Sequence, residues 1–197
     1  CGLAEESYTI TIEAPTGELV YDGTEKKANI VVKEGEVTLE NAPFEINNIT
    51  YTLEETPVDK CINAGAYTAS ITLGEGENAK SVSVEYTIEK SNPKAENFIF
   101  TAPENLTYDG EEKTATVVVE GGVTGMGDVT VIYFDETGKK LNDAPVNAGV
   151  YNVKIALAEG TNYESILEET PLEQEDWEFE ISKADATSGK YDVHVSK

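Results

Sequence analysis

The side chains that usually perform catalysis or bind metals are scarce in this chain. His194 is the only histidine, and Cys1 and Cys61 are the only cysteines. A Ser–His–Asp triad and a multi-histidine zinc site are therefore excluded, and two cysteines make neither a zinc site nor a disulfide scaffold. Cys61 corresponds to Pro145 in an internal repeat, so we interpret it as a small apolar filler. We expect no catalytic residues and no enzyme activity.

Acidic residues dominate the charged composition. The chain has 38 Asp and Glu residues against 14 Lys and Arg, all of which are lysines, and its net charge is −24. Such a surface repels phosphate, which disfavours nucleic acid and anionic membranes as partners. We interpret the acidity mainly as a source of solubility and expect no cofactor. The alternative is weak calcium binding at acidic loops such as Glu34–Glu36 or Glu173–Asp176, although no EF-hand loop is present.

Three aromatic residues are candidates for ligand contact: Trp177, Tyr163 and Tyr133. Aromatic rings commonly contribute to glycan and protein interfaces, but each of these residues lies on or beside a predicted strand. Core packing therefore explains all three equally well, and both interpretations stay open at this point.

The first residue, Cys1, has two interpretations. In a mature bacterial lipoprotein the first residue is a cysteine that carries lipid, so Cys1 is a candidate lipid anchor; otherwise the chain was simply cut at this point. A disulfide between Cys1 and Cys61 is a third arrangement that the sequence leaves open. No apolar run approaches the roughly 20 residues that a membrane-spanning helix needs, so we expect no transmembrane segment.

Three motifs occur twice in the same order, which indicates a duplicated module with loop insertions. Their separations are 87, 84 and 93 residues respectively. The pairs are Leu19–Gly23 followed by Lys26, which returns as Leu106–Gly110 followed by Lys113; Asn63-Ala64-Gly65-x-Tyr67, which returns as Asn147-Ala148-Gly149-x-Tyr151; and Tyr86–Lys90, which returns as Phe179–Lys183.

Alternating apolar and polar residues predict short strands along the whole chain. Gly, Pro, Asn and Asp residues separate these segments, as expected of turns. No segment predicts a convincing helix, and the nearest candidate, Glu164–Glu175, contains Pro171 and is better interpreted as a loop. The core-facing positions are Tyr8, Ile10 and Ile12; Ala28, Ile30 and Val32; Ile49, Tyr51 and Leu53; Tyr67, Ala69, Ile71 and Leu73; Val82, Val84, Tyr86 and Ile88; Phe98 and Phe100; Val117 and Val119; Val129, Val131 and Tyr133; Tyr151, Val153, Ile155 and Leu157; Trp177, Phe179 and Ile181.

These patterns predict an all-β protein made of two tandem immunoglobulin-like β-sandwich domains. The predicted domains are residues 1–91 and 92–184, joined by the linker Ser91–Ala95 as a rod. Residues 185–197 form a C-terminal strand, either the start of a third repeat or an added edge strand. The alternative fold is a pair of β-grasp-like modules, which would need a helix packed on each sheet.

Two repeated motifs have predicted structural roles. The Tyr-Asp-Gly sequences Tyr21-Asp22-Gly23 and Tyr108-Asp109-Gly110 predict tight turns, because glycine accepts a positive φ and aspartate can bond nearby backbone. Tyr67 and Tyr151 are expected to form tyrosine corners, in which the hydroxyl bonds back to nearby backbone. The lysine after each turn, Lys26 or Lys113, either bridges to an acidic neighbour or lies in water.

Together these motifs resemble the YDG/MBG-type repeat modules of bacterial surface and secreted proteins. The resemblance covers nearly the whole chain as two copies, and the first copy departs from it at Ala79, where the second has Tyr163. The matching residues are Tyr21-Asp22-Gly23 with Lys26, Asn63-Ala64-Gly65-x-Tyr67 and Ile88-Glu89-Lys90, then Tyr108-Asp109-Gly110 with Lys113, Asn147-Ala148-Gly149-x-Tyr151, Gly160-x-Asn162-Tyr163 and Ile181-Ser182-Lys183-Ala184.

The resemblance implies a stalk or spacer in a multi-repeat cell-envelope protein, with no catalytic residues. We therefore expect a non-catalytic structural module of a bacterial cell-surface or secreted protein, located extracellularly or at the cell surface. Its partners would be other repeats of the same protein. The alternative is an adhesin-type binding module that recognises a glycan or protein of a host or a cell wall.

Overall fold

The computed structural model describes residues 8–41, 48–73 and 79–185. These residues are all-β, and their only helix is η2 (Ala95–Asn97), a single 3-10 turn. The predicted all-β class is therefore confirmed. No helix of the described ranges lies across a sheet, as a β-grasp module would require. The chain divides into two compact units, Cys1–Ser91 and Asn92–Lys197. The strand predicted for 185–197 falls, beyond Asp185, outside the described residues.

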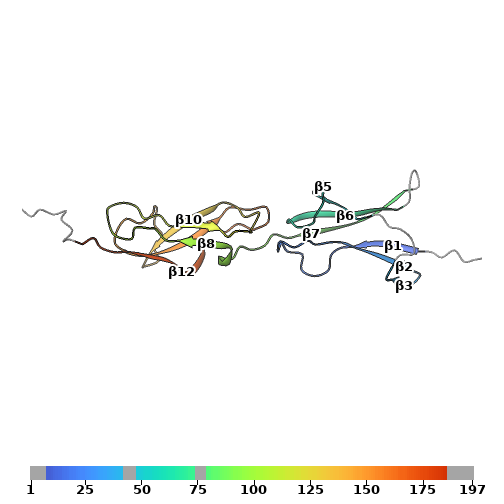
Figure 1. Ribbon diagram of the computed structural model, residues 1–197, viewed down its shortest axis with the longest axis horizontal. Coiled ribbons are helices and arrows are strands. Elements are labelled where there is room, and N and C mark those ends of the chain that lie inside the picture. The colour runs from blue at the N-terminus through green and yellow to red at the C-terminus, as the bar shows by residue number, and fades with distance from the viewer. Residues whose placement is uncertain (1–7, 42–47, 74–78, 186–197) are drawn as a thin grey trace, which may run out of the picture. The chain divides into compact units, whose positions relative to one another are not determined.

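The first unit contains two antiparallel sheets, which lie on opposite sides of the unit in Figure 1. The first sheet has three strands in the order β1 (Tyr8–Glu13), β2 (Asn29–Glu34) and β3 (Val37–Leu39). The second has four strands in the order β5 (Thr56–Val58), β4 (Thr50–Leu53), β6 (Gly65–Leu73) and β7 (Lys80–Ile88). Fully buried side chains alternate with more exposed ones along β6, as the period-two pattern predicts. The buried apolar residues of this unit are Ile12, Tyr21, Ala28, Val32, Cys61, Tyr67, Ala69, Ile71, Tyr86 and Ile88.

The second unit repeats the arrangement with fewer strands. Its first sheet pairs β8 (Phe98–Thr101) with β9 (Thr116–Val119). Its second sheet has the order β10 (Val129–Asp135), β11 (Gly149–Leu157) and β12 (Leu172–Ile181). The core joins residues of both sheets: Phe98, Ala115, Val117, Tyr133, Tyr151, Val153, Ile155, Leu157, Trp177, Phe179 and Ile181.

In each unit the chain leaves the first sheet and pairs briefly with the last strand of the second. Val20 forms a parallel bridge with Glu89, and Thr107 forms the equivalent bridge with Ser182. In the first unit the Tyr21 amide donates to the Glu89 carbonyl, and the Glu89 amide donates to the Leu19 carbonyl, both at 2.8 Å. The second unit has the same two bonds, so the duplicated sequence produces duplicated topology.

Two short strands of the first unit were not predicted from the sequence. β3 follows β2 through the two-residue turn at Gly35, whose φ of 60° suits the first position of a hairpin turn. β5 follows β4 through Glu54 and Glu55, whose φ values are 48° and 68°. Such turns normally require Asn or Gly, so two glutamates gave no turn signal.

Candidate functional site

The repeated Tyr-Asp-Gly turn is closed by the lysine that follows it. The Lys26 ammonium donates to Asp22 Oδ2 at 2.5 Å, and the Lys113 ammonium donates to Asp109 Oδ2 at 2.7 Å. Gly23 takes a φ of 77°, in the left-handed region that a tight turn demands. Of the two outcomes left open for these lysines, the structure therefore shows the bridge. We call this pair of residues in each unit the Asp–Lys clasp.

The lysine of each clasp is largely shielded from water. The Lys113 side chain is only 5 % exposed, and that of Lys26 is 16 % exposed. The hydrogen bond from Lys26, followed by that from Thr24, lowers the pKa of the Asp22 carboxyl to about 2. The bond from Lys113 likewise lowers the pKa of Asp109. Each carboxylate is therefore held ionised by its own turn.

The backbone of the clasp lysine fastens the turn to the rest of its unit. The Lys26 amide donates to the Cys61 carbonyl, and the Lys113 amide donates to the Pro145 carbonyl, both at 2.8 Å. Each acceptor lies just before the repeated Asn-Ala-Gly motif. The two repeated motifs are thus bonded to each other in both units.

The repeated tyrosines each bond to the backbone four residues earlier. The Tyr67 hydroxyl donates to the Asn63 carbonyl at 2.9 Å, and the Tyr151 hydroxyl donates to the Asn147 carbonyl at 2.8 Å. The hydrogen bond expected of a tyrosine corner is present in both units. The glycine of the motif takes a positive φ, 139° at Gly65, which residues with a Cβ rarely adopt. A Cβ on Gly65 would also lie 2.6 Å from Cδ1 at the end of the Leu53 side chain.

Cys61 is enclosed in the core of the first unit. Its side chain is fully buried, its thiol is free, and it forms a hydrogen bond with the side chain of Tyr86. Tyr86 stacks on Tyr67 at a centroid distance of 5.5 Å. Burial raises the pKa of the Cys61 thiol, so the group stays protonated at neutral pH and lacks the character of an activated nucleophile.

The three aromatic residues considered as ligand contacts lie inside the second unit. Trp177, Tyr133 and Tyr163 are 4 %, 7 % and 9 % exposed. The Trp177 ring meets Phe98 edge to face, with centroids 6.4 Å apart. The Tyr133 hydroxyl accepts a hydrogen bond from the Ala115 amide at 2.9 Å. Core packing accounts for these residues, and none of the three presents an open ring to a ligand.

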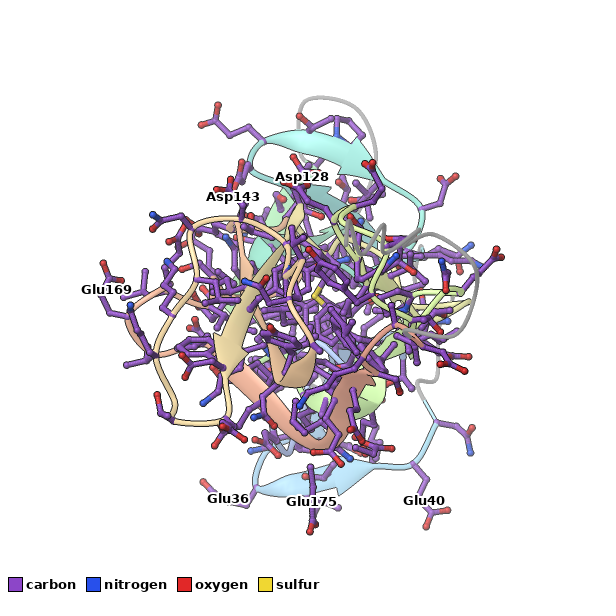
Figure 2. The ribbon with its side chains drawn as sticks, turned by 90° about the vertical axis from the view of Figure 1, so that its left-hand side faces the viewer. Glu36, Glu40, Asp128, Asp143, Glu169 and Glu175 are labelled. Atoms are coloured by element: carbon purple, nitrogen blue, oxygen red, sulfur yellow. The ribbon has the colours of Figure 1, made fainter. Side chains whose placement is uncertain are left out.

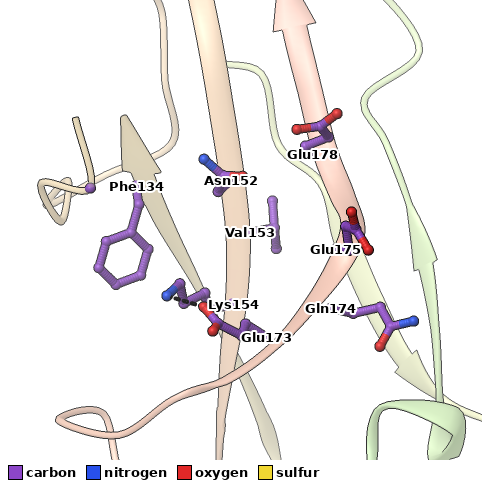
Figure 3. A pocket seen from close by; sticks show the side chains of 9 residues that line it. Phe134, Asn152, Val153, Lys154, Glu173, Gln174, Glu175 and Glu178 are labelled. Atoms are coloured by element: carbon purple, nitrogen blue, oxygen red, sulfur yellow. Dashed lines mark ion pairs between the residues drawn. The ribbon is translucent and has the colours of Figure 1, made fainter. Parts of the chain in front are cut away.

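A groove of about 600 Å³ lies on the second unit, beside an irregularity in the pairing of β11 with β12. Figure 3 shows the Lys154 ammonium between the Phe134 ring, 5.0 Å from its centroid, and the carboxylate of Glu173, with which it forms an ion pair. Glu175 and Glu178 of β12 complete the acidic side of the groove. Since Lys154 and Glu173 already bind each other, the groove does not offer them as a free acid–base pair.

The acidic residues spread over the surface. Figure 2 shows the Glu36, Glu40, Glu169 and Glu175 side chains pointing away from the ribbon. Within the described part of the chain, no group of three or more His, Cys, Asp or Glu residues is arranged to hold a metal ion. The same residues include no helix that is long and apolar enough to cross a membrane. Cys1, the candidate lipid anchor, and His194 lie outside the described residues.

Sequence reasoning missed a buried polar contact in the second unit. Asn162 is 2 % exposed. Its backbone amide donates to the Gly125 carbonyl at 3.0 Å, and its side-chain Nδ2 donates to the Thr124 carbonyl at 3.3 Å. A Cβ on Gly127 would lie 2.0 Å from the Ala158 carbonyl oxygen, so the two loops pack backbone against backbone. The glycines between Gly121 and Gly127 were the available signal. We call this contact the Asn162 lock.

Comparison of the chain with models of known protein families, with curated proteins and with solved structures gives no match.

Proposed function

We propose that the chain is a pair of tandem immunoglobulin-like β-sandwich modules that serve as a non-catalytic spacer in a bacterial cell-surface or secreted protein. The immunoglobulin-like assignment is supported by the two sheets of the first unit, the tyrosine corner, and the early segment that bridges to the last strand. The YDG/MBG-type resemblance supports the extracellular setting.

One observation carries the spacer proposal: the residues that are repeated make their contacts inside their own unit. The clasp aspartates bond the clasp lysines, and the corner tyrosines bond backbone. Each duplicated residue stabilises a turn, a corner or a bridge of its own unit. This supports a structural role, because a duplicated active site would be expected to repeat its reactive groups instead. The other repeats of a longer protein are the proposed partners.

Small-angle X-ray scattering on the purified chain tests this function. A spacer must hold its two ends apart, so the maximum dimension should approach the sum of the lengths of two sandwich modules and should not change with salt. A compact particle, with the two units folded against each other, would contradict a spacer. A glycan or protein array tests the adhesin alternative, for which the buried Trp177 offers no support.

A further inference from the structure

The strand residues on the outward face of the sheet formed by β8 and β9 carry no charge. Ile99 and Val118 are directly opposed in the register and are 44 % and 54 % exposed. The next pair on the same face is Thr101 with Thr116, both exposed. In a chain with a net charge of −24, the strand residues on this face are all β-branched and uncharged. The pair that follows on the same face is Asn97 with Glu120, so a carboxylate lies at its end.

Strand β9 also has an open edge. Among the described residues β8 is its only partner strand. The Glu120 amide donates to the Asn97 carbonyl at 2.8 Å, which makes Asn97 and Glu120 a hydrogen-bonded pair. Because bonded and non-bonded pairs alternate in an antiparallel ladder, the backbone groups of Val117 and Val119 point away from β8. They form a row of donors and acceptors that can receive another strand.

In the first unit, the edge equivalent to that of β9 is covered by another strand. Val119 corresponds to Val32 of β2, and Val32 is paired with Leu39 of β3. An antiparallel strand therefore occupies in the first unit the position that is open in the second. The equivalent of Val118 is Val31, which is only half-buried there rather than exposed.

The Asn162 lock explains why the second unit lacks its own covering strand. After β9 the chain turns at Gly121–Gly122, as β2 turns at Gly35. The residues that follow are then bonded to Asn162 through the Thr124 and Gly125 carbonyls. The segment that would become the third strand is thereby held elsewhere, and the edge of β9 stays open in the folded unit.

Three other edge strands carry features that discourage pairing with a foreign strand. Charged residues and proline at an edge are the usual protection against such pairing. β3 is followed and preceded by Glu40 and Glu36, β5 contains Pro57, and β12 contains five acidic residues between Glu173 and Glu180. Within β9 itself, Thr-Val-Val-Val, there is neither a charged residue nor a proline, although Glu120 follows this strand as Glu40 follows β3.

We infer that the open edge of β9 binds an extended segment of a partner protein, which adds to the sheet as an antiparallel strand. The segment has alternating β-branched or aliphatic residues at its centre, to meet Val118 and Ile99, and lysine or arginine at its flanks. The flanking charge follows from Glu112 and Glu120 on either side of β9 and from the net charge of −24. A second copy of the chain is disfavoured as the occupant, since two such acidic chains repel each other. This inference goes beyond the spacer function and does not depend on it.

The test uses the full chain, labelled with ¹⁵N, and the synthetic peptide KKVTLTVKK, whose centre copies the Val-Thr-Leu sequence of β3. We expect the peptide, at about 1 mM, to shift the amide signals of Val117 and Val119 and to slow their hydrogen exchange. The acidic peptide EEVTLTVEE should bind about tenfold more weakly at low salt. KKVTPTVKK, which cannot continue as a strand, should not bind.

Two variants and a matched control locate the site. Val118→Lys places a charge on the outward face, and Val119→Pro removes an outward donor that β8 does not use; each should weaken binding about tenfold or more. The control, Val31→Lys, makes the equivalent change on the covered edge of the first unit and should leave binding unchanged.

Several results would overturn the inference. These are the absence of shifts at Val117 and Val119, equal binding of the acidic peptide, or shifts confined to other strands. Sedimentation showing a dimer that Val118→Lys dissolves would make a second copy the occupant and would equally refute a partner segment.

Discussion

The tyrosine corner of the second unit yields the sharpest test of how these modules are held together. Tyr151→Phe keeps the ring, which is 8 % exposed, and removes only the hydroxyl that donates to the Asn147 carbonyl at 2.8 Å. No cavity forms, and Asn147 is exposed, so water can reach its carbonyl. The expected loss of stability is therefore that of one hydrogen bond, about 1 kcal/mol.

The chain contains its own reporter for this measurement. Trp177 is the only tryptophan and lies buried in the core of the second unit, so its fluorescence follows the unfolding of that unit in urea. For a domain of this size, about 1 kcal/mol corresponds to a fall in Tm of roughly 4–8 °C. The slope of the urea transition should not change, since the same surface is exposed on unfolding.

The control is Tyr108→Phe, in the same unit. Tyr108 is 40 % exposed, and its replacement should change the free energy of unfolding by less than about 0.5 kcal/mol. Equal stability of Tyr151→Phe and the unaltered protein, or an equal loss at Tyr108, would refute the role assigned to the corner.

Two further predictions concern the close packing of loops and the clasp. Gly127→Ala should lower the free energy of unfolding of the second unit in urea by about 1–3 kcal/mol, because its Cβ would lie 2.0 Å from the Ala158 carbonyl oxygen. The control, Gly121→Ala, has open space around it and should be nearly neutral. Equal effects of the two substitutions would contradict the packing described. The pKa of Asp22 is lowered to about 2 from an ordinary value of 3.8, so its contribution is complete above pH 4 and is lost as the pH falls through 2. Because Asp22 is half-exposed, that contribution is about 0.5–1 kcal/mol. Lys26→Met should flatten this part of the stability–pH curve, and an unchanged acid limb would show that the clasp contributes nothing.

Much of the architecture could be predicted because its signals are local. Alternation along segments such as Gly65–Leu73 reports burial on one face, and the repeated Asn-Ala-Gly-x-Tyr motif places a tyrosine where its hydroxyl reaches backbone. The short β3 and β5 were missed because three residues carry too little alternation. The turn of β5 also uses Glu54 and Glu55 at positive φ, where residue preference points the other way.

The candidate functional residues were harder to predict, because exposure depends on tertiary packing. Trp177 and Tyr133 suit either a core or a binding surface from their sequence context, and only the structure places them inside. The Asp–Lys clasp could be predicted only in part, since a lysine four residues after an aspartate indicates an ion pair but does not determine its burial. The Asn162 lock joins loops that lie more than thirty residues apart, so the glycines between Gly121 and Gly127 indicated a close backbone approach without naming its partner.

The parallel bridges between Val20 and Glu89 and between Thr107 and Ser182 have a mechanical consequence. In two strands that run the same way, tension on the chain drags one strand backwards and the other forwards along their common axis. Both hydrogen bonds of a bridge are then sheared together instead of being peeled apart in turn. Each unit therefore resists stretching at the point where the segment after its first strand meets the end of its last strand.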